Sequence, residues 1–138
     1  MDLINRYTND VIFSAEVETV NELVVAAISA KADLREANLR GADLRGAKLF
    51  AADLYGANLF GAKAEINGHS VLQINGLAYP ILITDTHLRA GCQNHTFAEW
   101  RAMTKEQIDG MDGKRAIKFY PVLISIIDAL CKDRESGV

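Results

Sequence analysis

The sequence predicts a solenoid, and two observations carry that prediction. Seven consecutive five-residue units run from Ala32 to Ile66 without insertion or deletion, reading ADLRE, ANLRG, ADLRG, AKLFA, ADLYG, ANLFG and AKAEI. Ala opens every unit, and Leu stands two residues later in every unit except the last, where Ala64 takes its place. A period of five fits neither a helix nor the two-residue alternation of a strand. Repetition at a fixed period indicates a solenoid, in which each unit buries its apolar side against its neighbours.

The pattern A-(D/N)-L-x-x over 32–66 resembles the pentapeptide-repeat family. The resemblance implies a mainly β fold, a short right-handed four-sided β-helix with one unit on each side. It also implies that the Leu and Ala side chains point into the interior. With four units in each turn, residues twenty positions apart are expected to lie beside each other on the same side.

Residues 1–31 predict an N-terminal strand and helix that cap the repeats. The segment Val11–Val17 is β-branched and partly alternating, which favours a short strand. Thr19 and Glu22 have capping-box spacing before an apolar run compatible with a helix. An uncapped solenoid end would expose apolar side chains, so we interpret this helix as its cover. The face expected to cover the end comprises Val20, Leu23, Val24, Ala27 and Ile28.

After the repeats, 67–95 predicts an irregular terminal β coil or hairpin, with two strands around Gly76. Residues 96–138 predict a C-terminal helical element, and the whole chain is expected to form one compact domain. Capping boxes begin helices at Thr96 and Thr104, and Asp112-Gly113 predicts a break before a final helix over 115–132. Within that helix, Pro121 predicts a kink or a fresh first turn.

The final helix carries an apolar stripe at helical spacing. Its members are Phe119, Val122, Leu123, Ile126, Ile127 and Leu130. The stripe either packs within the chain or forms the seam of a homodimer.

Composition and charge limit the partners. The formal net charge of −3 is too small to predict nucleic acid as a partner by attraction. No window approaches the roughly 18 consecutive apolar residues that span a bilayer, so no membrane partner is expected. The N-terminus shows no signal peptide. Cys92 and Cys131 do not form a disulfide framework, which predicts a cytoplasmic location.

The order of the segments also resembles pentapeptide-repeat proteins of phage and prophage genomes, a subgroup of uncharacterised function. The likeness extends through Ile83–Cys92 and Cys92–Trp100. It implies a phage-encoded protein that works in the cytoplasm of a host cell. It implies no role for any single residue.

The residue after each Leu is expected to face outward, and the candidate binding residues come from this series. They are Arg35, Arg40, Arg45, Phe50, Tyr55 and Phe60. The twenty-residue offset places Arg35 beside Tyr55 and Arg40 beside Phe60, within reach of a guanidinium-on-ring contact. Arg and aromatic side chains are enriched at recognition surfaces. The alternatives are that ring stacking only stabilises adjacent coils, or that the C-terminal helices cover this face.

A second cluster predicts a candidate pocket, formed by His87, Cys92, His95 and Trp100. Cys92 and His95 have metal-like spacing, and His87 could supply a third ligand. A structural zinc site needs four ligands, so neither a metal nor another cofactor is expected. A Cys–His nucleophile pair stays open, beside the alternative of local packing and hydrogen bonding. No phosphate-binding, dinucleotide-binding or hydrolase motif is present in the sequence.

These observations predict a non-enzymatic interaction protein that binds a host protein or another copy of itself. The first alternative is a small-molecule-binding protein or an enzyme with a pocket near 85–100. The second alternative, which the resemblance to pentapeptide-repeat proteins implies, is a gyrase inhibitor that imitates DNA. Five acidic and five basic residues in the seven units give that segment no net charge, whereas DNA carries about one negative charge per 1.7 Å of axis.

Overall fold

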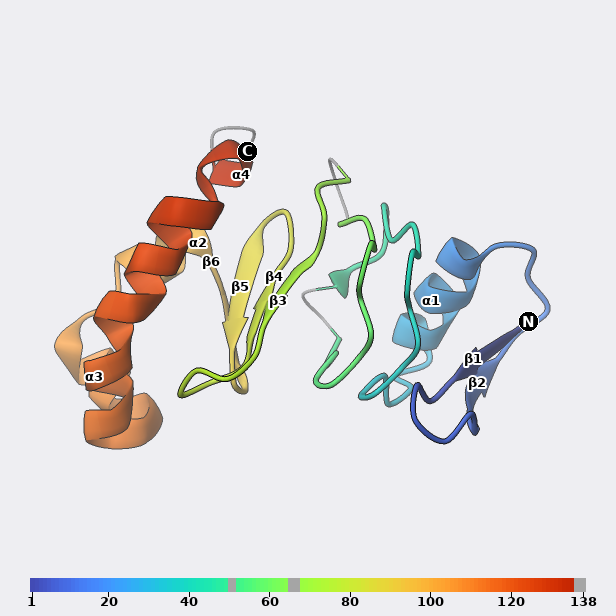
Figure 1. Ribbon diagram of the computed structural model, residues 1–138, viewed down its shortest axis with the longest axis horizontal. Helices are drawn as coiled ribbons and strands as arrows, with labels where there is room; N and C mark the ends of the chain where they lie inside the picture. Colours follow the sequence, from blue (N-terminus) through green and yellow to red (C-terminus); the bar gives the residue numbers. More distant parts are fainter. Residues whose placement is uncertain (50–51, 65–67, 136–138) are drawn as a thin grey trace. The chain divides into compact units, whose positions relative to one another are not determined.

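The computed structural model describes residues 1–49, 52–64 and 68–135, and the chain divides into two compact units, Met1–Gln73 and Ile74–Val138. Figure 1 labels their helices and strands. The N-terminal unit contains β1 (Asp2–Ile4), β2 (Val11–Ser14), α1 (Val20–Ser29) and the repeats. Strand β3 (Leu72–Ile74) spans the boundary. The C-terminal unit contains β4 (Ile81–Ile83), β5 (His87–Ala90), β6 (Gln93–Thr96), α2 (Phe97–Arg101), α3 (Lys105–Leu130) and α4 (Lys132–Glu135).

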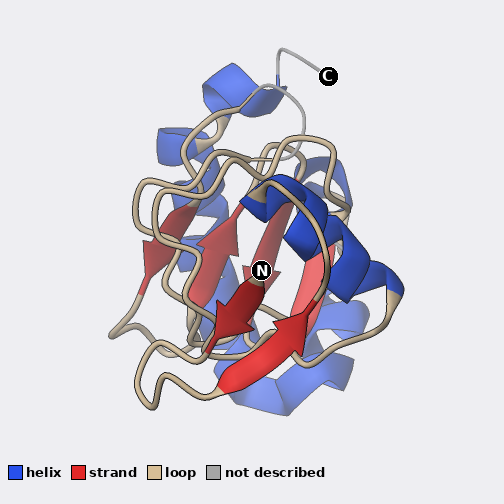
Figure 2. Cartoon of the chain, turned by 90° about the vertical axis from the view of Figure 1, so that its right-hand side faces the viewer, coloured by secondary structure: helices blue, strands red, loops and turns tan. Residues whose placement is uncertain are grey.

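The N-terminal unit begins with an antiparallel pair, β1 and β2, followed by α1 (Figure 2). The hydroxyl of Thr19 accepts from the backbone N of Glu22 at 3.1 Å, as the capping pattern predicts. The Glu22 carboxylate accepts from the backbone N of Glu18 rather than that of Thr19, so only half of the box forms. Helix α1 buries part of its predicted face, and Val20 is 40% exposed. The buried residues are Leu23, Val24 and Ala27.

The repeat coil, which we define as 32–49 and 52–64, turns a corner after each Leu. At a typical corner, the backbone N of Ala42 donates to the carbonyl of Leu39 at 3.0 Å, and Gly41 has a φ of 71°. A type II turn needs a positive φ at its third residue, which explains why Gly recurs there in the sequence. Glu36 occupies the same position at its own corner with a φ of 63°. The units therefore bend at a fixed place set by their fifth residue.

Successive turns of the repeat coil stack with the predicted offset of twenty residues. Parallel bridges join Asn38 to Asn58 and Asp43 to Lys63. Around the first bridge, the backbone N of Asn58 donates to the carbonyl of Ala37 at 2.9 Å. The Leu side chains fill the interior, each at most 2% exposed. They are Leu34, Leu39, Leu44, Leu49, Leu54 and Leu59.

The prediction of a mainly β protein needs correction, because the described residues have mixed α and β content. The repeat coil pairs through isolated bridges, and none of its described residues lies in a strand. The strands elsewhere are short, and the pairs β1–β2, β4–β5 and β5–β6 are antiparallel. Helices make up much of the C-terminal unit.

The C-terminal unit places β4, β5 and β6 in an antiparallel sheet. Strands β5 and β6 join through Gly91 and Cys92, with Ala90 opposite Gln93. This hairpin was not expected, since the predicted strands of 67–95 lie around Gly76. Along β5 the buried Leu88 and Ala90 alternate with the half-buried His87 and Arg89. The sequence therefore contains the two-residue period of a strand, but over only four residues.

Both capping boxes predicted for the C-terminal helices form completely, at Thr96 with Glu99 and at Thr104 with Gln107. The predicted break also occurs, because Gly113 interrupts α3 with φ 58° and ψ −140°. Pro121 lies inside the second half of the helix. No helix in the described ranges is long and apolar enough to cross a membrane.

The predicted apolar stripe of the last helix is narrower than expected. Phe119, Leu123 and Ile127 are buried, whereas Val122 is 43% exposed and Leu130 is 41% exposed. Residues four apart share one line on a helix, which gives the buried side this spacing. The stripe therefore serves mainly as internal packing.

Candidate functional site

The repeat coil carries an arginine and an aromatic ring in contact on its outer surface. The guanidinium carbon of Arg40 lies 5.3 Å from the centroid of the Phe60 ring. The backbone brings them together, because the N of Gly41 donates to the carbonyl of Phe60 at 2.8 Å. Phe60 is 72% exposed, and Tyr55 on the preceding unit is 59% exposed. Tyr55 and Phe60 lie at successive corners of the coil, and we call the surface that Arg40, Tyr55 and Phe60 span the ring face.

The two other candidate arginines are tied to carboxylates two residues earlier. Arg35 binds Asp33 through Nε at 2.9 Å and through its terminal nitrogen at 2.6 Å. Arg45 binds Asp43 with the same pair of distances. Each bidentate bond, with a backbone bond from the same arginine, lowers the pKa of its carboxyl to about 2. In both arginines, Nε and one terminal nitrogen therefore already donate to a carboxylate.

Arg40 differs because Asn38, and not an aspartate, precedes it by two residues. An amide carries no charge to hold a guanidinium, and the Asn38 oxygen only accepts from the backbone N of Arg40 at 3.4 Å. In the described part of the chain, Arg40 forms no ion pair within 4.0 Å, and it lies over Phe60 instead. One Asp-to-Asn change between repeats therefore releases this arginine to the ring.

The corner that bears Tyr55 is also contacted by Arg6, which lies in the turn between β1 and β2. The Arg6 guanidinium donates to the carbonyl of Gly56 at 3.1 Å and lies 4.9 Å from the ring of Tyr7. Tyr7 is 67% exposed. The sequence analysis missed Arg6 and Tyr7, because they lie outside the repeats and no motif marks them. No guanidinium-on-ring contact joins Arg35 to Tyr55 within the residues described.

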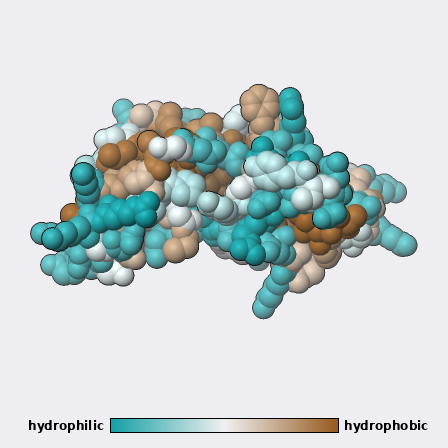
Figure 3. Space-filling view, turned by 60° about the horizontal axis from the view of Figure 1, so that its bottom comes forward, coloured by the Kyte–Doolittle hydropathy of each residue, from teal (hydrophilic) through white to brown (hydrophobic). Residues whose placement is uncertain are grey.

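The remaining candidates of this surface are placed as follows. The aliphatic part of Arg45 lies beside Gly68, where a β-carbon would come within 3.3 Å of its Cδ. Phe50 lies outside the described residues. In the space-filling view, the visible surface is mainly hydrophilic, with separate apolar patches (Figure 3).

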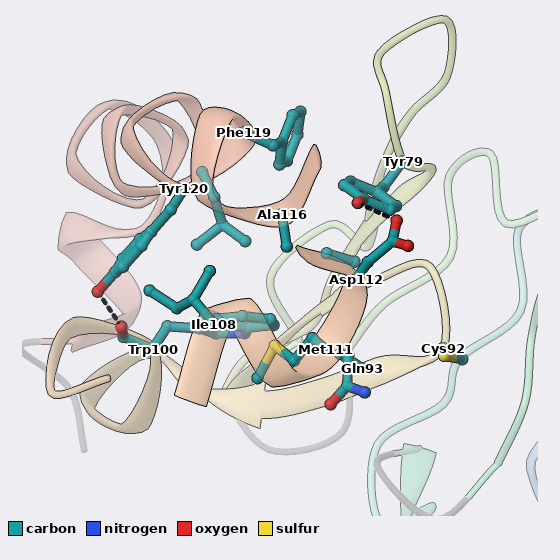
Figure 4. A pocket seen from close by; sticks show the side chains of 12 residues that line it. Tyr79, Cys92, Gln93, Trp100, Ile108, Met111, Asp112, Ala116, Phe119 and Tyr120 are labelled. Atoms are coloured by element: carbon teal, nitrogen blue, oxygen red, sulfur yellow. Dashed lines mark hydrogen bonds between the residues drawn. The ribbon is translucent and has the colours of Figure 1, made fainter. Parts of the chain in front are cut away.

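The C-terminal unit contains a cavity of about 260 Å³ under the kinked helix α3 (Figure 4). It is lined by side chains from the segment before β4, from the β5–β6 hairpin, from α2 and from both halves of α3. They are Tyr79, Ala90, Cys92, Gln93, Trp100, Ile108, Met111, Asp112, Ala116, Phe119, Tyr120 and Leu123. Cys92 and Trp100 belong to the predicted pocket, and most of the other lining residues were missed, although the predicted break at 112–113 begins at one of them, Asp112.

One edge of the cavity is polar. The Tyr79 hydroxyl donates to Oδ2 of Asp112 at 2.5 Å, and the Arg115 guanidinium carbon lies 4.7 Å from the Tyr79 ring. The Tyr79 ring also meets Phe119 edge to face, with centroids 5.2 Å apart. Burial, followed by the bond to Asp112, raises the pKa of Tyr79 above its usual value. The Tyr79 hydroxyl therefore keeps its proton at neutral pH and remains a hydrogen-bond donor.

The four residues of the predicted pocket are only partly brought together. Trp100 is 4% exposed, lines the cavity and donates from Nε1 to the carbonyl of Leu88 at 2.7 Å. His95 packs its ring edge against Trp100, with centroids 4.9 Å apart. Cys92 is exposed at the hairpin turn and borders the cavity.

His87 has a different environment, because its Nδ1 and the Thr86 hydroxyl are hydrogen-bonded at 2.7 Å. His87 and His95 are not among the lining residues of the cavity. Across the described ranges, no group of three His, Cys, Asp or Glu side chains is arranged to hold a metal ion. The cavity therefore presents aromatic rings and one carboxylate, and no cluster of metal-binding side chains is found in the described residues.

Comparisons with known proteins give one positive result. The model of pentapeptide repeats matches residues 30–63 in eight copies, and such repeats imply a fold of the β-helix type for that segment. No curated protein and no solved structure matches the chain. Residues 30–63 are therefore a pentapeptide-repeat segment.

Proposed function

We propose that this chain is a non-enzymatic interaction protein that binds another protein through the ring face of its repeat coil. The observation that carries the proposal is the Arg40–Phe60 contact on side chains that stay exposed. Pentapeptide repeats suggest at most a role in protein interaction, and the finer assignment to these residues is ours.

The energetics favour binding over stability as the role of these side chains. An exposed guanidinium-on-ring contact contributes only about 0.5–1 kcal/mol. Phe60 at 72% exposure buries little apolar area, so its ring adds little to the fold. On a partner, the same ring would be desolvated, and aromatic and Arg side chains in such positions dominate binding energy.

The repeat coil would act as a rigid support. Interior Leu side chains and backbone bonds between successive turns hold the outer residues at fixed spacing. We propose that this support is the right-handed four-sided β-helix that the repeat pattern implies. A backbone that is already ordered loses little conformational freedom on binding, which favours affinity.

The partner is proposed to be a host protein, with the chain encoded by a phage and working in the host cytoplasm. The order of the segments supports the proposed phage origin of the chain, and a gene that lies outside any phage or prophage region would contradict that origin. Self-association is the second candidate partner. It is favoured by the exposed Val122 and Leu130 on the last helix, and sedimentation velocity of wild type beside Leu130→Asp tests it.

Two other functions are less well supported. Imitation of DNA needs a row of unpaired negative charge, but Asp33 and Asp43 are paired with arginines. A supercoiling assay with purified gyrase tests this function directly, and inhibition at micromolar protein would support imitation of DNA. An enzyme at 85–100 is not favoured, because His95 packs on Trp100 and His87 bonds to Thr86.

Affinity capture from an extract of the source organism tests the proposed function. The matched set is wild type, Tyr55→Ala/Phe60→Ala and Val122→Ala, the last removing an exposed apolar side chain from the other unit. A protein retained by wild type and Val122→Ala but lost by the double variant is expected. Equal capture by all three, with all three folded, would contradict the proposal.

A further inference from the structure

The cavity of the C-terminal unit is not used by the proposed interaction surface. We infer that it binds a small neutral aromatic molecule that carries one hydrogen-bond donor, a ligand of the phenol class. The inference rests on the walls of the cavity, on the polar group at its edge and on the backbone break that shapes it. It does not depend on the ring face.

The walls fit an aromatic ring. Tyr79, Trp100, Phe119 and Tyr120 contribute four rings, which Figure 4 shows on different sides of Ala116, and the apolar Ile108 also lines the cavity. Aromatic pairs gain stability from edge-to-face or offset contacts beyond area burial alone. A cavity of about 150 Å³ lined by apolar side chains suffices to bind benzene. The present volume, about 260 Å³, therefore accommodates a ring with substituents.

The polar edge selects a neutral molecule with a donor. Asp112 accepts from Tyr79 through Oδ2, which leaves Oδ1 as an acceptor for a ligand. The ionised carboxylate can only accept hydrogen bonds, so an anion that brings no donor gains no hydrogen bond from Oδ1. The Arg115 guanidinium lies 3.9 Å from Oδ2 and offsets much of its charge, so a cation gains little. A phenol or a similar hydroxyl-bearing ring satisfies both the walls and the edge.

The backbone break places the two halves of α3 on different sides of the cavity. Ile108 and Met111 come from the first half, and Ala116, Phe119 and Leu123 come from the second. Gly113 between the halves has φ 58° and ψ −140°, a conformation almost restricted to glycine. Backbone conformations of this kind cluster at ligand sites, and protein interiors otherwise leave few voids larger than a water molecule.

The single tryptophan of the chain reports on the site, because Trp100 lines the cavity. Phenol, toluene and benzoate are titrated into the full chain while Trp100 emission is recorded. Phenol is expected to give a saturable change, toluene a weaker one and benzoate none. The absence of a saturable response to phenol would overturn the inference, and benzoate binding as tightly as phenol would overturn the assigned ligand class.

Filling the cavity supplies the matched variants. Ala116→Phe is expected to weaken phenol binding at least about tenfold, whereas Ala129→Phe, at an exposed position of the same helix, changes it less than about twofold. Thermal unfolding checks that both variants fold, and Ala116→Leu replaces the first if it does not. A folded Ala116 variant with wild-type affinity, or equal weakening by Ala129→Phe, would overturn the site.

Phe60→Ala separates this inference from the proposed function. The variant alters the ring face in the other unit, so the phenol response is expected to stay within about twofold of wild type. A lost response would show that phenol binds at the ring face, and the assignment of the cavity would then fail.

Discussion

Arg40 and Phe60, twenty residues apart in the sequence, lie in contact on successive turns of the repeat coil, with the guanidinium carbon 5.3 Å from the ring centroid. The contact exists because Asn38 leaves Arg40 without the carboxylate that holds Arg35 and Arg45. The Phe60 ring is 72% exposed, and the contact defines the proposed binding surface.

The contact itself should contribute little to folding. A double-mutant cycle of Arg40→Ala and Phe60→Ala is expected to give a coupling energy of about 0.5–1 kcal/mol at most, because both side chains are hydrated. Urea unfolding of the four proteins measures it. A coupling above about 2 kcal/mol would show that the pair stabilises the fold and would weaken its assignment to binding.

The interior of the repeat coil should behave oppositely. Leu59 is fully buried, so Leu59→Ala is expected to lower the free energy of unfolding by about 2–5 kcal/mol. Val25→Ala, at a helix position 39% exposed in the same unit, should change it by less than about 0.5 kcal/mol. Urea unfolding compares the two, and similar small effects would contradict the buried Leu interior.

The carboxyl of Asp43 should titrate unusually low. Its pKa is lowered to about 2 chiefly by the side-chain bond from Arg45. The bond between Asp43 and Arg45 therefore stabilises the folded chain at pH values above the usual carboxyl pKa, and this contribution is lost as the pH falls towards 2. In Arg45→Gln the pKa of Asp43 should return towards about 3.9, while Arg40→Gln leaves it low. An NMR titration of the carboxyl carbon measures this pKa, and an ordinary value in wild type would contradict the ion pair.

The break in α3 gives a pair of glycine variants with opposite expected signs. Gly113→Ala places a β-carbon at positive φ and should destabilise the chain by about 1–3 kcal/mol, although no atom lies within 4 Å of it. Gly110→Ala also has open space but lies in the helix without a positive φ, and should stabilise by about 0.5–1 kcal/mol. Thermal unfolding compares them, and stabilisation by both would show that the break is not fixed by Gly113.

Local patterns predicted much of the fold. The resemblance to pentapeptide repeats implied the interior Leu side chains and the twenty-residue offset, and the structure shows both. Capping spacings located the starts of three helices, at Thr19, Thr96 and Thr104. The β5–β6 hairpin was missed, because its alternation at Leu88 and Ala90 is too short to be distinguished from a loop.

The sites were less predictable than the fold. The pairing of Arg40 with Phe60 followed from the repeat, but its dependence on Asn38 appeared only when the Asp33–Arg35 bond was seen. The predicted pocket shares only Cys92 and Trp100 with the cavity, because most of the lining residues come from other segments whose approach depends on tertiary packing. The Asp112-Gly113 break indicated a change of direction without showing what it encloses.

Site-specific crosslinking tests the central claim most directly. A photoreactive phenylalanine analogue replaces Phe60 in one protein and the exposed Leu130 in another, and each is irradiated in an extract of the source organism. We expect one dominant covalent adduct from position 60, abolished by excess wild-type protein but not by excess Arg40→Ala/Tyr55→Ala/Phe60→Ala. No competable adduct at position 60, or the same adduct from position 130, would contradict the assignment of the ring face as the binding surface.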